Sequence, residues 1–203
     1  MCSSDLCVSR IRREVGIPVT VKHRTGVDRI EDYAFLRNFV ATVAAAGCGT
    51  FIVHARNAIL KGLSPKENRE VPPLKYEYVY RLKQDFPQLR IVINGGITSR
   101  QQIEEHLAHL DGVMLGRAAY HNPWLLADAG KTRADVVKRM AGYAKTVASL
   151  RQVTRHMLGL YHGHPRARLW RRLLSDSALL KQNDPGLLLD ALDAVESRVM
   201  IAA

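Results

Sequence analysis

The sequence predicts an α/β fold that corresponds to the C-terminal half of a (βα)8 TIM barrel, with four βα units, followed by a small all-α helical domain. Two observations support this. Short apolar strand-like runs, each followed by a stretch that reads as helix, occur at 18–22, 50–54, 90–96 and 111–117. This alternation is typical of parallel sheets. Past residue 130 the strand pattern stops, so we place a partial barrel in 1–130 and a helical domain in 131–203.

In chain order, the end of a helix over residues 7–15 leads through Gly16 into the first strand. We expect a helix from Asp28 to Ala46, because its apolar residues recur at helical spacing. The loop over 55–74 is long, and structureless loops of this length are usually functional or disordered. Further helices are expected over 76–86 and over 98–110, the latter with Thr98 or Ser99 as N-cap.

The fourth strand is expected to run into Ala118–Tyr120, with a short helix beginning at Asn122-Pro123. The helical domain is expected to contain four helices, over 135–149, 152–160, 165–180 and 186–200.

Polar residues and glycines follow each predicted strand, at the carboxyl edge where parallel α/β folds bind ligands. Asn94, Gly95 and Gly96 follow the third strand, where two consecutive glycines expose backbone N–H groups that can cradle a phosphate. Gly116 and Arg117 follow the fourth strand. They would add to the same phosphate site a backbone N–H that no side chain covers and a guanidinium group. A lone Gly-Gly is more often a plain turn, but its pairing with Gly-Arg on the next strand favours a phosphate site.

Lys22 and His54 end the first two predicted strands. Lys22 either extends its ammonium into solvent or holds an anionic ring, and the residues alone leave both open. His54 fits either a buried structural histidine or a ligand contact. Their shared position at the ligand edge favours binding.

The charge balance indicates a polyanionic partner. The 203 residues carry a formal net charge of +11, and residues 151–172 contain six arginines and no acidic residue. On the helix within 165–180, Arg168, Arg171 and Arg172 share one face. A run of charged residues is usually a solvated surface. A run of positive charge without any acidic residue favours a nucleic acid partner, bound through its phosphates. No run is apolar enough for a membrane span, so we expect no membrane contact.

Cysteine usage suits a reducing compartment and hence a cytoplasmic location. Cys2, Cys7 and Cys48 have irregular spacing, which favours neither a disulfide framework nor a metal site.

Six segments together resemble the A-type tRNA-dihydrouridine synthases. They are Val21–Asp28, Ile52–Ala58, Gly62–Leu74, Ile93–Ile97, Asp111–Tyr120 and Thr154–Leu160. The resemblance covers the chain from about Val8 to its C-terminus, and the Ser-Pro-Lys-Glu-Asn-Arg loop within Gly62–Leu74 is distinctive of the subfamily. The family fold is an FMN-binding barrel followed by a helical tRNA-binding domain.

The resemblance implies that the enzyme reduces D-loop uridines of tRNA to 5,6-dihydrouridine, with FMN as cofactor and NADPH as electron donor. It assigns FMN contacts to Lys22, His54, Asn94, Gly95, Gly96, Gly116 and Arg117. It assigns tRNA contacts to Lys66, Arg69, Arg168 and Arg171. The intact enzyme is expected to be monomeric.

The family's proton-donating cysteine lies in the first half of the barrel, which has no counterpart in this sequence. We therefore assign the catalytic role to no residue, and expect the chain by itself to be inactive. Two alternatives remain. One is another FMN-binding TIM-barrel oxidoreductase that acts on a small molecule, which would need neither the basic tail nor the long loop. The other is a non-catalytic tRNA-binding module.

Overall fold

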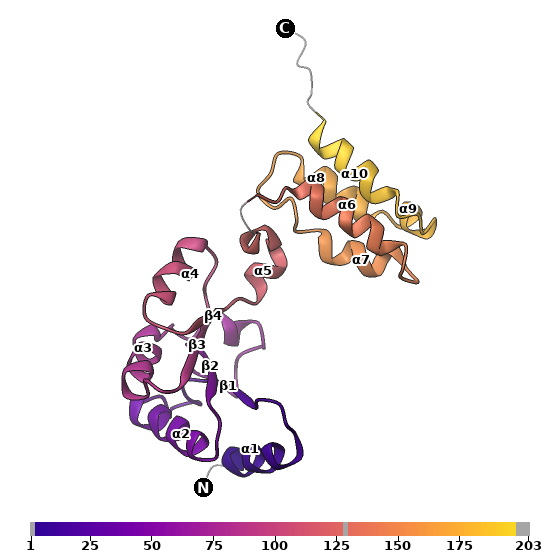
Figure 1. The fold of residues 1–203 in the computed structure, drawn as a ribbon. Helices are drawn as coiled ribbons and strands as arrows, with labels where there is room; N and C mark the ends of the chain where they lie inside the picture. Colours follow the sequence, from indigo (N-terminus) through magenta and orange to yellow (C-terminus); the bar gives the residue numbers. More distant parts are fainter. Residues whose placement is uncertain (1–2, 128–129, 198–203) are drawn as a thin grey trace. The chain divides into compact units, whose positions relative to one another are not determined.

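The computed structural model describes residues 3–127 and 130–197 (Figure 1). By its internal contacts the chain divides after Gly116 into two compact units, and each is described here by itself. We call residues 1–116 the sheet unit and residues 117–203 the helical unit. The boundary drawn from the sequence, after residue 130, falls inside the helical unit. The separate binding roles assigned to the two parts stay predictions.

The sheet unit contains a four-stranded parallel sheet in the order β1-β2-β3-β4. Its strands are β1 (Thr20–Arg24), β2 (Thr50–His54), β3 (Arg90–Asn94) and β4 (Gly112–Met114). Its helices are α1 (Ser3–Glu14), α2 (Tyr33–Ala45), α3 (Tyr76–Asp85) and α4 (Arg100–Leu107), with a 3-10 turn η1 (Glu67–Arg69) between β2 and α3. The α/β class and the parallel sheet expected from the sequence are confirmed.

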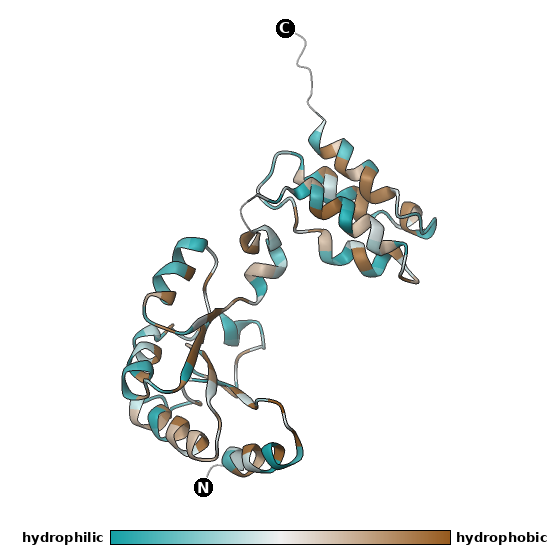
Figure 2. Ribbon diagram, viewed as in Figure 1, coloured by the Kyte–Doolittle hydropathy of each residue, from teal (hydrophilic) through white to brown (hydrophobic). Residues whose placement is uncertain are grey.

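Strand alternation decides which face of the sheet is core. Phe51 and Val53 on β2 and Ile91 and Ile93 on β3 are fully buried with side chains of α2 and α3. Figure 1 shows these helices along one side of the sheet. The residues between them, such as Ile52 and Val92, are only half-buried on the other face. Figure 2 shows the apolar character of the central strand β3. One face of the sheet therefore packs in the core, and the other face is only partly covered.

Three expected boundaries are corrected. The first strand ends at Arg24 rather than Lys22, because pairing with β2 continues for two more residues. The second helix begins at Tyr33, not at Asp28, because the Asp32 carboxylate accepts the backbone N–H of Phe35 and caps it. Ala118–Tyr120 is helical rather than strand, because β4 ends at Met114 and α5 begins at Arg117.

The helical unit contains six α-helices within its described residues, and a 3-10 turn. They are α5 (Arg117–His121), η2 (Pro123–Leu126), α6 (Arg133–Ala144), α7 (Leu150–Met157), α8 (Ala167–Ser175), α9 (Ser177–Lys181) and α10 (Leu187–Glu196). The helix expected over 165–180 is divided at Asp176, whose side chain caps α9. The last residues of the helix expected over 186–200, 198–200, lie outside the described residues.

Large side chains on α7, α8 and α10 and in the α7–α8 loop form the core of the helical unit. Trp170 and Tyr161 are fully buried and their rings lie 4.7 Å apart. The Trp170 indole N–H donates to the Met157 carbonyl oxygen at 2.9 Å, which joins α8 to the end of α7. Leu174 and Leu188 complete this cluster.

Across the described residues, no helix combines the length and apolarity that a membrane span requires. Cys7 is exposed and Cys48 is buried, both as free thiols, and Cys2 lies outside the described residues.

Candidate functional site at the carboxyl edge of the sheet

The strand register brings four residues into one row at the carboxyl end of the sheet. Arg24 pairs with His54, His54 with Asn94, and Asn94 with Met114. Directly paired residues of parallel strands point to the same face, so this row lies on the face opposite the buried Phe51 and Val53. The Asn94 amide donates to the Met114 carbonyl oxygen at 2.8 Å, which fixes its orientation beside β4.

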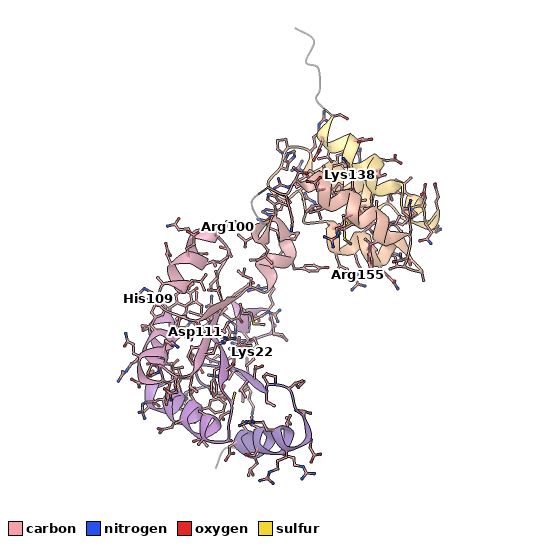
Figure 3. All side chains as sticks on the ribbon, in the orientation of Figure 1. Lys22, Arg100, His109, Asp111, Lys138 and Arg155 are labelled. Carbon is pink, nitrogen blue, oxygen red and sulfur yellow. The ribbon has the colours of Figure 1, made fainter. Side chains whose placement is uncertain are left out.

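Lys22 lies inside β1 rather than at its end. It pairs with Ile52 and so stands two residues before Arg24, on the same face as the row. Its side chain is exposed, and Figure 3 labels it at the sheet. The pKa of the Lys22 ammonium is lowered, first because nearby protein atoms partly exclude water from it and second because Arg24 carries a positive charge. The position expected at the strand end is taken by Arg24, which the sequence reasoning missed.

The Gly95-Gly96 loop requires two residues without side chains. Their φ angles are +113° and +73°, values that favour glycine. A Cβ on Gly95 would lie 2.6 Å from Cδ2 of His54, and one on Gly96 would lie 2.7 Å from Cδ1 of Leu74. His54, itself buried, therefore packs directly on the glycine loop.

Tyr76, the first residue of α3, supports the same loop. Its hydroxyl donates to the Gly95 carbonyl oxygen at 2.7 Å, and its ring packs edge-on against the buried His106 imidazole of α4. Burial raises the pKa of the Tyr76 phenol, so the hydroxyl keeps its proton. His106 in turn shares a 2.7 Å hydrogen bond through Nδ1 with the Tyr80 hydroxyl. A chain of aromatic contacts therefore fixes the orientation of the Gly95 peptide.

Gly116 follows β4, and a Cβ there would meet nothing within 4 Å. Arg117 is exposed and begins α5, in the helical unit. Within the sheet unit, the structure thus brings together His54, Asn94 and the two loop glycines, and it places Lys22 on the same face of the sheet.

The long loop after β2 is an ordered segment. Lys66 and Arg69 are both exposed at η1. Ser64 and Glu67 cap this turn reciprocally: the Ser64 N–H donates to the Glu67 carboxylate at 2.8 Å and the Glu67 N–H to the Ser64 hydroxyl at 3.3 Å. These bonds lower the pKa of Glu67. The Ser-x-x-Glu spacing is a capping-box signal that predicts such order.

Arg24 joins β1 to this loop. Its Nη1 donates to the carbonyl oxygens of Asn57 at 2.8 Å and Asn68 at 2.7 Å. Burial and the positive charges of Arg56 and Arg69 lower the pKa of Arg24, so three guanidinium groups lie near one another at this edge. No local pattern marks Arg24, because Lys22, His23 and Arg24 are three polar residues in succession, and only the pairing with β2 shows that the strand continues to it.

In the helical unit, the predicted tRNA contacts lie on an amphipathic helix. Arg168 and Arg171 are exposed on α8, whereas Trp170 and Leu174 are buried. On α7, which packs against α8, Arg151 and Arg155 are also exposed, and Figure 3 labels Arg155. The unit therefore presents basic side chains outward from an apolar core.

Comparison with known proteins shows the family of this chain. The family model described as dihydrouridine synthase (Dus) matches residues 4–196. The chain belongs to the dihydrouridine synthase family. This confirms the resemblance seen in the sequence motifs.

Curated relatives carry the name tRNA-dihydrouridine(20/20a) synthase. That of Synechocystis sp. is 53% identical over 211 residues, covering 96% of this chain and 63% of the relative. That of Shewanella oneidensis is 52% identical, covering 85% and 56%, and that of Escherichia coli K12 is 49% identical, covering 95% and 60%. The chain thus spans about three fifths of the length of the family members it matches. A crystal structure of mandelate oxidase aligns with a TM-score of 0.37 and 13% identity over 94% of this chain and 68% of that one, too weak a likeness to support a conclusion.

Proposed function

We propose that this chain carries the flavin-binding sheet edge and the tRNA-binding helices of an enzyme that reduces tRNA uridines to 5,6-dihydrouridine with NADPH. In this proposal the sheet unit is four βα units of a TIM barrel and the helical unit follows it as an RNA-binding domain. The observation that carries it is the packing of His54 on the Gly95-Gly96 loop, in one row with Asn94. The tRNA-dihydrouridine(20/20a) synthase name of the relatives supports the substrate.

The residues at the sheet edge fit FMN. Bound FMN would accept electrons from NADPH and deliver hydride to the uracil ring. Gly96 and Gly116 are exposed and carry no side chain between their backbone and a phosphate oxygen. Lys22 offers an ammonium on the same face, suited to the electron-rich side of a reduced flavin. Arg117, next in the chain to Gly116, would add a guanidinium to the phosphate.

Two sets of basic residues would hold the tRNA. Lys66 and Arg69 would contact it beside the flavin site, and Arg168 and Arg171 would contact phosphates from α8. Each of these side chains is exposed, so it could contact a phosphate without any change in the packing of a core. Contacts of this kind release counterions, so the affinity should fall steeply as salt concentration rises.

The test measures tRNA affinity and FMN binding in parallel, with the double variant Arg168→Ala/Arg171→Ala and with Lys22→Ala. The double variant should weaken tRNA binding by roughly 1–3 kcal/mol and flatten its dependence on salt, while FMN binding stays unchanged. Lys22→Ala should weaken FMN binding and spare tRNA affinity.

Lys138→Ala/Arg139→Ala, at two exposed residues of α6 of which Figure 3 labels Lys138, removes two charges elsewhere in the helical unit and is the matched control. A double variant that loses FMN and retains its tRNA affinity would contradict the assignment of RNA binding to α8.

A further inference from the structure

The loops after β1 and β2 are joined by backbone hydrogen bonds into one platform. The N–H of Asp28 donates to the Ala58 carbonyl oxygen at 2.7 Å, and the N–H of Ala58 to that of Gly26 at 2.9 Å. The side chain of Asp28 also accepts the Leu60 N–H at 2.8 Å. Residues 26–28 and 58–60 therefore form a fixed base at the carboxyl edge of the sheet.

The segment Ser64–Val71, which carries Lys66 and Arg69, is anchored to this base by hydrogen bonds. The Asn68 side chain is one: its Oδ1 accepts the Ile59 N–H at 2.9 Å, and its Nδ2 donates to the Ile59 carbonyl oxygen. The carbonyl oxygen of the same Asn68 is held by Arg24 at 2.7 Å. Other bonds of the turn, such as those from the Asn68 N–H to the Ser64 carbonyl oxygen and from the Val71 N–H to the Glu67 carbonyl oxygen, are local.

Arg24 is suited to hold this segment because it belongs to the sheet itself. Its backbone is paired in β1, so its position is set by the core, and its single Nη1 reaches both the Asn57 carbonyl and the Asn68 carbonyl. Asn57 is buried, whereas Lys66 and Arg69 are exposed. The guanidinium therefore connects a strand paired within the sheet to an exposed basic turn.

We infer that Arg24 is a positioning residue for RNA recognition, which fixes the Ser64–Val71 turn so that Lys66 and Arg69 meet the tRNA as one preformed pair. The RNA part of this inference rests on the proposed function. Ordering the pair beforehand removes the conformational entropy that a mobile loop would lose on binding. Nearby Arg56 and Arg69 add positive charge without supplying these two hydrogen bonds.

The first arm measures amide hydrogen exchange without RNA, comparing Arg24→Met with Arg90→Met. Arg90 is exposed at the opposite, amino end of β3, so both variants lose one charge. Exchange at Asn68–Val71 should accelerate about tenfold or more in Arg24→Met and stay unchanged in Arg90→Met. Unchanged exchange in Arg24→Met overturns the inference.

The second arm is a double-mutant cycle on tRNA affinity. The pair Lys66→Ala/Arg69→Ala should weaken binding about tenfold in the wild-type background and less than about threefold in the Arg24→Met background, because the turn is already released there. Equal effects in both backgrounds would mean that Arg24 acts independently of the turn, and would overturn the inference.

Two outcomes are distinguished in advance. If the wild-type chain binds no tRNA, the proposed function fails, and the exchange arm alone decides the positioning role. If Arg24→Met does not fold, Arg24→Lys replaces it: the shorter side chain cannot reach both carbonyl oxygens, so exchange at Asn68–Val71 should rise. Wild-type exchange in that variant counts against the inference.

Discussion

The two units are stabilised in different ways. The sheet unit buries polar side chains, among them His54, Asn57 and His106. Ion pairs such as Lys83–Asp111 join its helices to the ends of its strands. The core of the helical unit is built from large apolar and aromatic side chains around Trp170, with its arginines outside.

The difference separates two kinds of function. Buried polar groups must be satisfied by particular partners, so they fix the loops of the sheet unit in one geometry. An amphipathic helix needs only an apolar stripe inside, so its outer face is free to carry charge. The sheet unit should therefore be sensitive to small changes of shape, and the surface of the helical unit to changes of charge.

The largest expected effect is the loss of the helical core in Trp170→Ala. Removing this fully buried ring, together with its hydrogen bond to Met157, should destabilise the helical unit by about 3–5 kcal/mol. Hydrogen exchange should show faster opening of α7 and α10 and unchanged protection of β2 and β3. Leu189→Ala, at a residue 40% exposed on α10, is the control with a small effect. Loss of protection in both units would show that their stabilities are coupled.

The same substitution, glycine to alanine, should act oppositely in the two units. Gly95→Ala adds a Cβ against His54 at a positive φ, and should destabilise the sheet unit by roughly 1–3 kcal/mol and weaken FMN binding. Gly142→Ala, inside α6 with nothing within 4 Å, should stabilise the helical unit by about 0.5–1 kcal/mol. Urea titrations measure both. A stable Gly95→Ala with normal FMN affinity would contradict the packing described.

Acid should destabilise the sheet unit first. Burial lowers the pKa of His23 and His106, so the folded unit keeps them neutral while the unfolded chain takes up protons below about pH 6.5. Stability should therefore be complete above pH 6.5 and decline as the pH falls toward the lowered values. The carboxylates Asp85 and Asp111 also have lowered pKa values, but they act only at more acidic pH.

Both tryptophans, Trp124 and Trp170, belong to the helical unit, so their fluorescence reports its unfolding separately. Hydrogen exchange of β2 at pH 7.5, 6.0 and 5.0 reports the sheet unit. His106→Phe should lower stability at neutral pH, since Tyr80 loses its partner, but make it less dependent on pH. An equal decline of both units with acid would argue against the role of these histidines.

The smallest effects compare one capping box in each unit. Ser99 caps α4 with Gln102, and Thr132 caps α6 with Asp135. Ser99→Ala and Thr132→Ala should each cost about 1 kcal/mol, confined to the unit that carries the helix. Ser177→Ala, at the first residue of α9 rather than at its cap, is the control. A cost below that of the control would show that the end of that helix does not limit its stability.

Much of this fold could be predicted from local patterns. The four strands, the helix at Tyr76 and a cap at Thr98 or Ser99, which the structure places at Ser99, follow from β-branched runs, helical spacing and capping chemistry, all of which depend on neighbours in sequence. The site was predicted less completely. The sequence pointed to His54, Asn94 and the two glycines, whereas Arg24 and Tyr76 act through partners about 20 to 45 residues away in the chain, which no local pattern reveals.

The sequence by itself determined the alternation of strands and helices, the basic helical tail and, through its motifs, the family. Only the tertiary structure decided that β1 continues to Arg24, because strand ends are set by pairing with β2 rather than by composition. It also decided that the loop over residues 55–74 is ordered. The hydrogen bonds that order it join Arg24, Ile59 and Asn68, and their geometry exists only once the sheet has formed.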